Sequence, residues 1–328
     1  MGNIMTLKTQ MEKIIHRSYR NIGGIVVRKE DKTVYESYFN ECMQDSKFHV
    51  FSVTKSIVSM LIGIAIDQGY IEGIHQKVLE FFPNYPVKKE EKAIQNITIK
   101  DMLMMTVPYK YKSEPYSAYF SSDDWVKASL DLLGGKGKIG EFRYAPVIGP
   151  DILSGIIAKA TGQSVLEFAK KNLFTPLEIQ VKSNIVFHSE EEQKAFYHAR
   201  NVDGWVSDPE GVNTAGWGLN LTTADMAKLG QLYLNEGIWK GRQLVSKQWI
   251  KESTRERSRC DQWELSYGYL WWIIDGNEHA YAAVGDGGNV IYINEKKKIV
   301  VSIASLFVPH VQDRIKLIRE YIEPAFEG

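Results

Sequence analysis

Ser52 and Lys55 are the residues whose types and spacing best suit chemistry, and they form the only Ser-x-x-Lys sequence in the chain, Ser52-Val53-Thr54-Lys55. They open an apolar stretch, 52–68, that we expect to be a long helix, so the two side chains lie one turn apart on one face. A serine hydroxyl is a weak nucleophile and needs a neighbour that takes its proton. Burial and the positive end of the helix both disfavour the ammonium form of Lys55, which lowers its pKa toward the working pH. The residues alone leave a simpler alternative open, in which Ser52 caps the helix and the Lys55 stem reaches to solvent.

The elements that position this pair divide the chain into strand-rich ends and a mainly helical middle. Strand-like runs are predicted at 23–28, 33–39, 267–274, 279–284, 289–293 and 299–303. Helices are predicted at 6–20, 52–68, 99–105, 122–133, 148–161, 165–173, 223–235, 245–252 and 311–322. Strands at both ends predict an α/β fold of the α+β type, in which the N- and C-terminal segments meet in one antiparallel sheet flanked by helices. We expect 1–70 and 262–328 to form this sheet subdomain and 71–261 a mainly helical one, with a cleft where they meet.

The composition excludes several classes of function. The 328 residues are 44% hydrophobic and carry 40 basic and 40 acidic side chains, so the formal net charge is zero and no nucleic-acid partner is expected. The most apolar run, 57–66, is too short to span a membrane, and the N-terminus has no apolar core of signal-peptide length, so we expect a cytoplasmic protein without a membrane span. Cys42 and Cys260 are then expected to stay reduced. No metal-ligand spacing occurs, so neither a metal nor another cofactor is expected.

Motifs in a fixed order along roughly residues 20–305 resemble those of the serine β-lactamase-related family, which includes class C β-lactamases, D-Ala-D-Ala peptidases and family VIII esterases. The resemblance is carried by Ser52-Val53-Thr54-Lys55-Ser56, Thr98-Ile99-Lys100-Asp101-Met102-Leu103, Phe142-Arg143-Tyr144-Ala145-Pro146, Gly216-Trp217-Gly218-Leu219 and Tyr267-Gly268-Tyr269-Leu270-Trp271-Trp272. It implies a β-lactamase/transpeptidase-like fold and a serine hydrolase that acts through an acyl-enzyme.

The same resemblance implies roles for further residues. Tyr144 would act with Lys55 as the general base pair, because a nearby ammonium favours the phenolate and the two groups can share one proton. The third family motif, a Lys-Thr-Gly or His-x-Gly triplet on a sheet-edge strand, is matched to Asp286-Gly287-Gly288. Its glycines would let a substrate approach the strand, and the N–H of Asn289 would join that of Ser52 as an oxyanion hole. As isolated residues, Tyr144 could be a packed aromatic side chain and the glycine segment an ordinary hairpin turn.

Two departures from the family pattern bear on the substrate. Pro146 stands where the tyrosine motif usually has Asn, and Asp286 stands where the third motif usually has Lys or His. That cation normally binds the substrate carboxylate, which an anion would repel by about 1 kcal/mol or more at short range. We therefore expect a hydrolase of a small uncharged or amine-bearing ester or amide, with weak or absent β-lactamase and D,D-peptidase activity.

Two other functions stay open at this point. One is a β-lactamase or D-Ala-D-Ala carboxypeptidase, a penicillin-binding protein whose substrate carboxylate meets some other cation. The other is a catalytically inactive binding or regulatory homologue. A Ser-His-Asp hydrolase has little support, because the chain lacks a G-x-S-x-G elbow, and His198 and His279 are expected to be structural or surface residues. Trp217, Trp271 and Trp272 are expected to line the substrate pocket.

Overall fold

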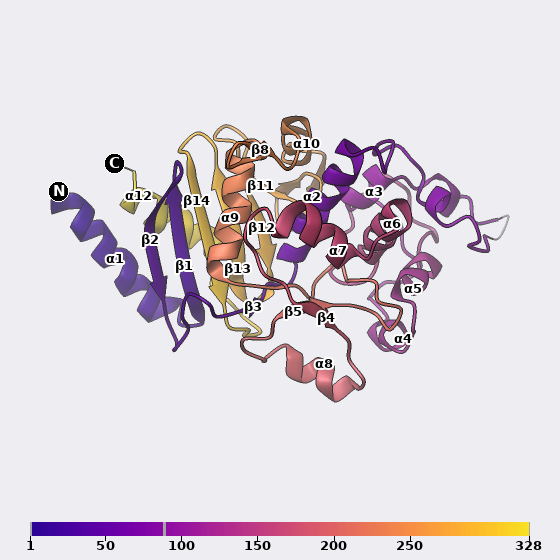
Figure 1. Cartoon of the computed structure of the whole chain (residues 1–328), viewed down its shortest axis with the longest axis horizontal. Coiled ribbons are helices and arrows are strands. Elements are labelled where there is room, and N and C mark those ends of the chain that lie inside the picture. The colour runs from indigo at the N-terminus through magenta and orange to yellow at the C-terminus, as the bar shows by residue number, and fades with distance from the viewer. Residues whose placement is uncertain (1, 88–89, 328) are drawn as a thin grey trace.

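The computed structural model describes residues 2–87 and 90–327, and an antiparallel sheet of eight described strands forms one half of it (Figure 1). The strand order is β2-β1-β14-β13-β12-β11-β10-β9. The strands are β1 Ile22–Lys29, β2 Lys32–Tyr38, β9 Ser258–Cys260, β10 Leu265–Tyr267, β11 Trp272–Asp275, β12 Ala280–Gly285, β13 Asn289–Asn294 and β14 Ile299–Ser305. The first strand pairs with the last, with Ile25 opposite Ile303, so the two ends of the chain meet in one sheet as the sequence predicts.

Helices cover both faces of this sheet. On one face, α1 (Gly2–Ser18) and the C-terminal helical segments α11 (Arg314–Leu317), Ile318–Ile322 and α12 (Glu323–Ala325) share a buried apolar cluster with the strands. On the other face lies α9 (Thr223–Leu234), which crosses β13 and β14 (Figure 1). Gly230 permits this close packing, since a Cβ there would come 2.5 Å from a methyl group of Val300. Each large apolar side chain buried in these layers contributes roughly 1.5–3 kcal/mol.

The α2 helix (Val53–Asp67) is the centre of the molecule and joins the sheet to the helical half. Its residues from Val53 to Ala65 are all buried, which explains why the helix is apolar on every side. It contacts β12 and β13 on the sheet side and α6 (Asp151–Thr161) on the other. The N-terminus of α2 therefore lies at the junction of the two halves of the fold.

The helical half is built from short helices with defined N-terminal caps. The Thr98 hydroxyl accepts a hydrogen bond from the Asp101 N–H at the start of α3, and the Asp124 carboxylate accepts one from the Lys127 N–H at the start of α5. These helices are α3 Ile99–Leu103, α4 Tyr116–Phe120, α5 Trp125–Asp131, α6 Asp151–Thr161, α7 Val165–Ala169, α8 Glu190–Phe196 and α10 Lys247–Ser253. The shorter strands pair as β3 Phe48–His49 with β6 Asn220–Leu221, β4 Ser183–Ile185 with β5 Gly204–Val206, and β7 Ile238–Trp239 with β8 Arg242–Gln243.

One strand prediction is wrong. The run 267–274 is not one strand, because it is split into the ends of β10 and β11 by a tight turn. Gly268 packs against the chain at Ser253, where a Cβ would come 2.2 Å from the carbonyl oxygen, and Leu270 adopts a left-handed φ of 63°. An unbroken apolar run does not reveal such a turn, since its cause is packing against α10.

The division of the chain into two subdomains stays a prediction. The C-terminal segment of the sheet begins at Ser258, a few residues before the predicted boundary at 262. In the described part of the chain, no helix is long and apolar enough to cross a membrane. Cys42 and Cys260 are both free thiols.

Candidate active site

Ser52 lies at the start of α2, directly after a residue with strained backbone. Phe51 has a left-handed φ of 49°, which is uncommon for a bulky residue and turns the chain sharply into the helix. Within the described residues the Ser52 side chain makes no capping bond to the helix. Its Oγ instead accepts a hydrogen bond from Lys55 Nζ at 2.9 Å. The alternative in which Ser52 caps the helix is therefore wrong, and the role of Ser52 as a nucleophile stays a prediction.

Lys55 is buried, with 2% of its surface exposed, and its ammonium is held by neutral oxygen atoms. Besides Ser52 Oγ, Nζ donates to the carbonyls of Pro146 at 2.6 Å and Gly216 at 2.8 Å. Burial lowers the pKa of Lys55 to about 8, against the opposing pull of more distant carboxylates, chiefly that of Glu114. With that pKa, roughly a tenth of the lysine is neutral at pH 7 and can accept a proton. The alternative in which Lys55 reaches to solvent is wrong.

Tyr144 lies beside this pair, but its proton behaves differently from the sequence prediction. Lys55 Nζ sits over the face of the ring, 5.2 Å from its centroid. Burial raises the pKa of Tyr144, a hydrogen bond with Ser52 lowers it, and the Asp286 and Glu114 carboxylates raise it further, with a net increase. The expectation that the ammonium favours the phenolate is therefore not met. The raised pKa keeps the proton on Tyr144 at neutral pH, whereas the lowered pKa leaves part of Lys55 neutral.

Asp151 organises the loop that holds Lys55, a role that sequence reasoning missed. Its carboxylate accepts from the Ala215 N–H at 2.7 Å and from the Tyr119 hydroxyl. This fixes the backbone at Gly216, whose carbonyl binds Lys55. Burial raises the pKa of Asp151 to about 6. An acidic residue in the first turn of a helix is common, so the only sequence signal was its nearness to Tyr144.

The residue of the sheet that approaches Ser52 is Gly285, one position before the predicted triplet. A Cβ on Gly285 would come 2.2 Å from the Val50 carbonyl oxygen and 3.2 Å from Ser52 N. Gly285 is the last residue of β12, and Asp286 begins a 3-10 turn. The triplet that ends in glycine on a strand is therefore Ala283-Val284-Gly285, and the predicted triplet Asp286-Gly287-Gly288 lies three residues further along the chain, in the turn after the strand.

Asn289 and Gly288 are not where the oxyanion prediction needs them. Asn289 is paired with Gly285 in the β12–β13 ladder, and its side chain donates to the Asp286 carbonyl at 2.7 Å. Gly288 packs against the Arg314 side chain. Neither is among the described residues that line the pocket at Ser52, whereas Asp286 is. The error is one of register, because a glycine-rich stretch offers several positions that match a short motif.

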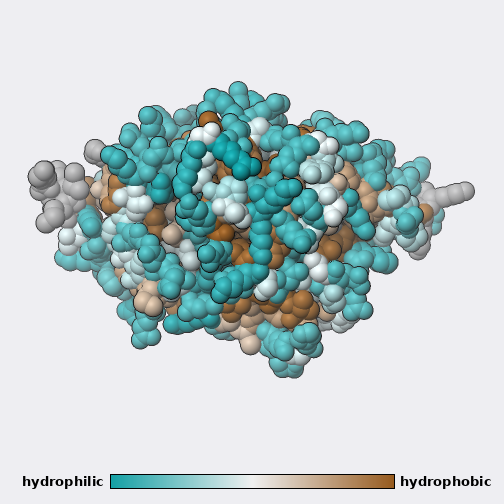
Figure 2. Space-filling model, in the orientation of Figure 1, coloured by the Kyte–Doolittle hydropathy of each residue, from teal (hydrophilic) through white to brown (hydrophobic). Residues whose placement is uncertain are grey.

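Ser52 opens onto a pocket of about 850 Å³ between the sheet and the helical half. Aromatic side chains form much of its wall: Phe51, Tyr116, Phe120, Trp125, Phe187, Tyr197, Trp217 and Phe307. Figure 2 shows hydrophobic residues in the recess above α8, the helix that projects beneath β4 and β5 in Figure 1. The expectation for Trp217 is confirmed. The prediction that Trp271 lines the pocket is wrong, because this side chain is fully buried against Tyr233. Trp272 packs behind Tyr144, with ring centroids 5.6 Å apart.

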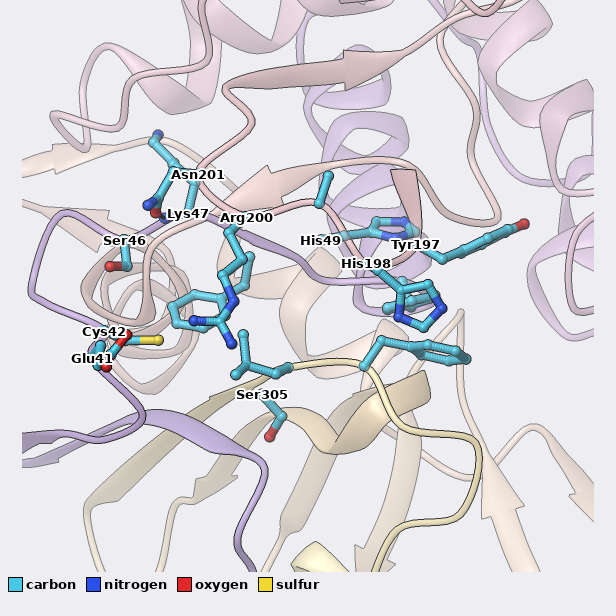
Figure 3. Close-up of a pocket in the computed structure, with 15 residues that line it drawn as sticks. Glu41, Cys42, Ser46, Lys47, His49, Tyr197, His198, Arg200, Asn201 and Ser305 are labelled. Atoms are coloured by element: carbon cyan, nitrogen blue, oxygen red, sulfur yellow. Dashed lines mark hydrogen bonds between the residues drawn. The ribbon is translucent and has the colours of Figure 1, made fainter. Parts of the chain in front are cut away.

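A second pocket of about 320 Å³ lies beyond this aromatic wall (Figure 3). Figure 3 shows Lys47, Cys42 and Asn201 at one end and His49, Tyr197 and His198 at the other. The two pockets share Phe51, Tyr197, His198 and Phe307. His198 is exposed at this boundary, as expected of a surface residue, and His279 is held by Glu295 at 2.7 Å. Lys47 and Arg200, together with Glu41, thus line the second pocket on the far side of the wall from Ser52.

Comparison with known proteins identifies the family of this chain. Residues 9–322 match the β-lactamase family. The 6-aminohexanoate-dimer hydrolase of Paenarthrobacter ureafaciens is 21% identical over 304 residues, which is 86% of this chain and 72% of that protein.

Two solved structures share the fold. A family VIII carboxylesterase superposes with a TM-score of 0.73 at 14% identity, over 97% of this chain and 96% of that one. A penicillin-binding protein homologue from Caulobacter crescentus has a TM-score of 0.73 at 16% identity, over 93% and 91% of the two chains. With the family match over nearly its whole length, this chain belongs to the β-lactamase family of serine hydrolases.

Proposed function

We propose that this protein hydrolyses small esters or amides through an acyl-enzyme on Ser52, with neutral Lys55 as the general base. The observation that carries the proposal is the 2.9 Å contact between Lys55 Nζ and Ser52 Oγ in a site that lowers the lysine pKa to about 8. A lysine in this state can take the serine proton as Oγ attacks the substrate carbonyl. Ser52 then carries the acyl group, and the alcohol or amine leaves.

The proton has a defined path to the leaving group. Tyr144 holds its proton at neutral pH, because burial raises its pKa, and it is hydrogen-bonded with Ser52. The phenol can donate that proton to the leaving oxygen or nitrogen and recover one from the Lys55 ammonium, which returns the lysine to its neutral form. In deacylation the same groups run in reverse, so that a water molecule is deprotonated and Ser52 is reprotonated.

The developing oxyanion needs two hydrogen-bond donors near Ser52. The Ser52 N–H is one, since it lies at the start of α2. Gly285 is the sheet residue that approaches Ser52, and the next amide along the chain is that of Asp286, which lines the pocket. We therefore assign the second donor to the Asp286 N–H in place of that of Asn289.

The substrate is expected to be an ester or amide without a carboxylate beside the reacting bond. Ala283 stands at the first position of the realigned triplet, where the family usually has a cation, and the Asp286 carboxylate adds a negative charge to the pocket. The names of the similar proteins, a dimer hydrolase of 6-aminohexanoate and a carboxylesterase, support amide or ester cleavage. Hydrolysis of penicillins or of D-Ala-D-Ala peptides is correspondingly disfavoured.

The test is intact-protein mass spectrometry after incubation with a fluorophosphonate, together with turnover of p-nitrophenyl butyrate. Wild type should gain one adduct and hydrolyse the ester, and Ser52→Ala should do neither. Ser117→Ala, which removes an exposed hydroxyl from the same pocket, is the matched control and should keep the adduct. An unmodified, inactive wild type would support a non-catalytic homologue, and efficient cleavage of benzylpenicillin would support a β-lactamase.

A further inference from the structure

The charged side chains that line the Ser52 pocket leave an excess of negative charge. Among the described residues these are Asp123, Glu190, Lys194 and Asp286. Lys194 Nζ lies 2.6 Å from Glu190, so these two charges compensate each other. Asp123 and Asp286 have no ion-pair partner within 4 Å in the described part of the chain. The pocket therefore presents two uncompensated carboxylates.

Asp286 acts on the centre of the pocket and not only on its rim. Asp286 lines the same pocket as Ser52, Tyr116 and Tyr197. Its charge opposes the lowering of the Lys55 pKa and contributes to raising the pKa values of Tyr144, Tyr116 and Tyr197. The carboxylate is therefore close to the reacting groups, where a bound substrate would feel its field. An exposed carboxylate is partly screened by water, and a ligand that displaces this water strengthens the interaction.

The aromatic wall is a second feature of the pocket that favours a cationic ligand. Tyr197 stacks on Trp217 with ring centroids 5.9 Å apart and on Phe51 with centroids 5.9 Å apart. Phe187 also stacks on Trp217, with ring centroids 6.2 Å apart. Aromatic faces attract organic cations, and clusters of them hold quaternary ammonium groups. Trp217 is 3% exposed and supports the wall from behind, so the rings that a ligand can reach include Tyr116, Phe187 and Tyr197. The apolar methyl or methylene groups of such a cation are also favoured by this surface.

We infer that the ester or amide cleaved at Ser52 carries an amine or quaternary ammonium group, which binds between the aromatic wall and the Asp286 carboxylate. This inference deepens the proposed function and rests on it. A carboxylate is disfavoured at the same place, since Lys47 and Arg200 lie in the separate pocket beyond Phe51 and Tyr197. Lys47 is moreover paired with Asp203 and Asp225, at 3.8 Å from each.

The test uses three p-nitrophenyl esters of similar shape and different charge. These are the esters of 4-(trimethylammonio)butanoate, of its carbon isostere 5,5-dimethylhexanoate, and the monoester of glutarate. At pH 8 and low ionic strength, kcat/KM of wild type should be about tenfold higher for the cationic than for the neutral ester, and lowest for the anionic ester. The readout is this ratio, so differences in overall rate between variants do not affect it.

Asp286→Asn keeps the shape of the side chain and removes its charge. The ratio of cationic to neutral ester should fall by about threefold in this variant. Glu72→Gln is the matched control, because it removes an exposed carboxylate outside both pockets and should keep the wild-type ratio. A wild-type ratio near or below one, or an unchanged ratio in Asp286→Asn, would overturn the inference.

A binding experiment separates this inference from the proposed chemistry. In Ser52→Ala, tryptophan fluorescence should report tighter binding of 4-(trimethylammonio)butanamide than of 5,5-dimethylhexanamide, also by about tenfold. If wild type hydrolyses no ester but this difference is found, the proposed function fails and cation recognition stands. If the neutral ester is hydrolysed through Ser52 and the two amides bind equally, the hydrolase stands and cation recognition fails.

Discussion

The pH dependence of Ser52 acylation is the sharpest test of the assignment of Lys55 as the base. Only the neutral lysine can accept the serine proton, so the acylation rate should follow the neutral fraction of Lys55. With a pKa of about 8, that fraction rises from roughly a tenth at pH 7 to roughly nine tenths at pH 9. The rate constant should therefore increase about tenfold over this interval and level off above it.

Stopped-flow measurement of the p-nitrophenol burst between pH 6 and 10 gives this rate constant directly. Lys55→Met retains a side chain of similar length without the base, and removal of a general base should lower acylation by about 10²–10⁴-fold. The remaining rate should lose the inflection near pH 8. A flat profile in wild type, or an inflection that persists in Lys55→Met, would refute the reasoning, since another group would then take the proton.

Three further predictions follow from the same geometry. The pKa of Lys55 is lower in the folded protein than in the unfolded chain, so the unfolded chain binds more protons between pH 8 and 10.5. Burial of this group therefore destabilises the fold by up to about 3 kcal/mol below pH 8, and this effect disappears as the pH rises. In urea unfolding, the stability of wild type relative to Lys55→Met should rise over this pH range, and a constant difference would contradict the lowered pKa. Asp151→Ala leaves the Ala215 N–H and the Tyr119 hydroxyl unpaired in the interior, so the free energy of urea unfolding should fall by about 2–4 kcal/mol. The value of kcat should also fall, because the Gly216 carbonyl that binds Lys55 loses its support. Wild-type values for both would show that the loop keeps its conformation without Asp151. Gly285→Ala places a Cβ 2.2 Å from the Val50 carbonyl oxygen and should abolish the fluorophosphonate adduct, while circular dichroism still shows a folded protein. Normal labelling would mean that this strand does not border the oxyanion site.

Much of the fold was readable from the sequence because it depends on local patterns. The hairpin near the N-terminus, the strands β12 to β14 and the helices α2, α6 and α9 all follow from apolar periodicity and turn residues. The split of 267–274 into two strands and the short pairs such as β4 with β5 were missed. These features have few residues and are held by contacts with distant segments, which no local pattern encodes.

The contact between the proposed nucleophile and the proposed base could also be predicted from the sequence. Ser52 and Lys55 are three residues apart on a helix, and this spacing brings their side chains together wherever the helix lies. The burial of α2 was likewise readable, because its residues are apolar on every side.

The rest of the site was decided by tertiary structure. The carbonyls of Pro146 and Gly216 that hold Lys55 come from segments 91 and 161 residues away along the chain, and the pKa of Tyr144 depends on burial and on carboxylates from other elements. The register of the glycine motif is set by the pairing of β12 with β13 and by the approach of Gly285 to Val50. A short motif states which residue types are present, but the residue that faces the nucleophile depends on how the sheet and the helix pack together.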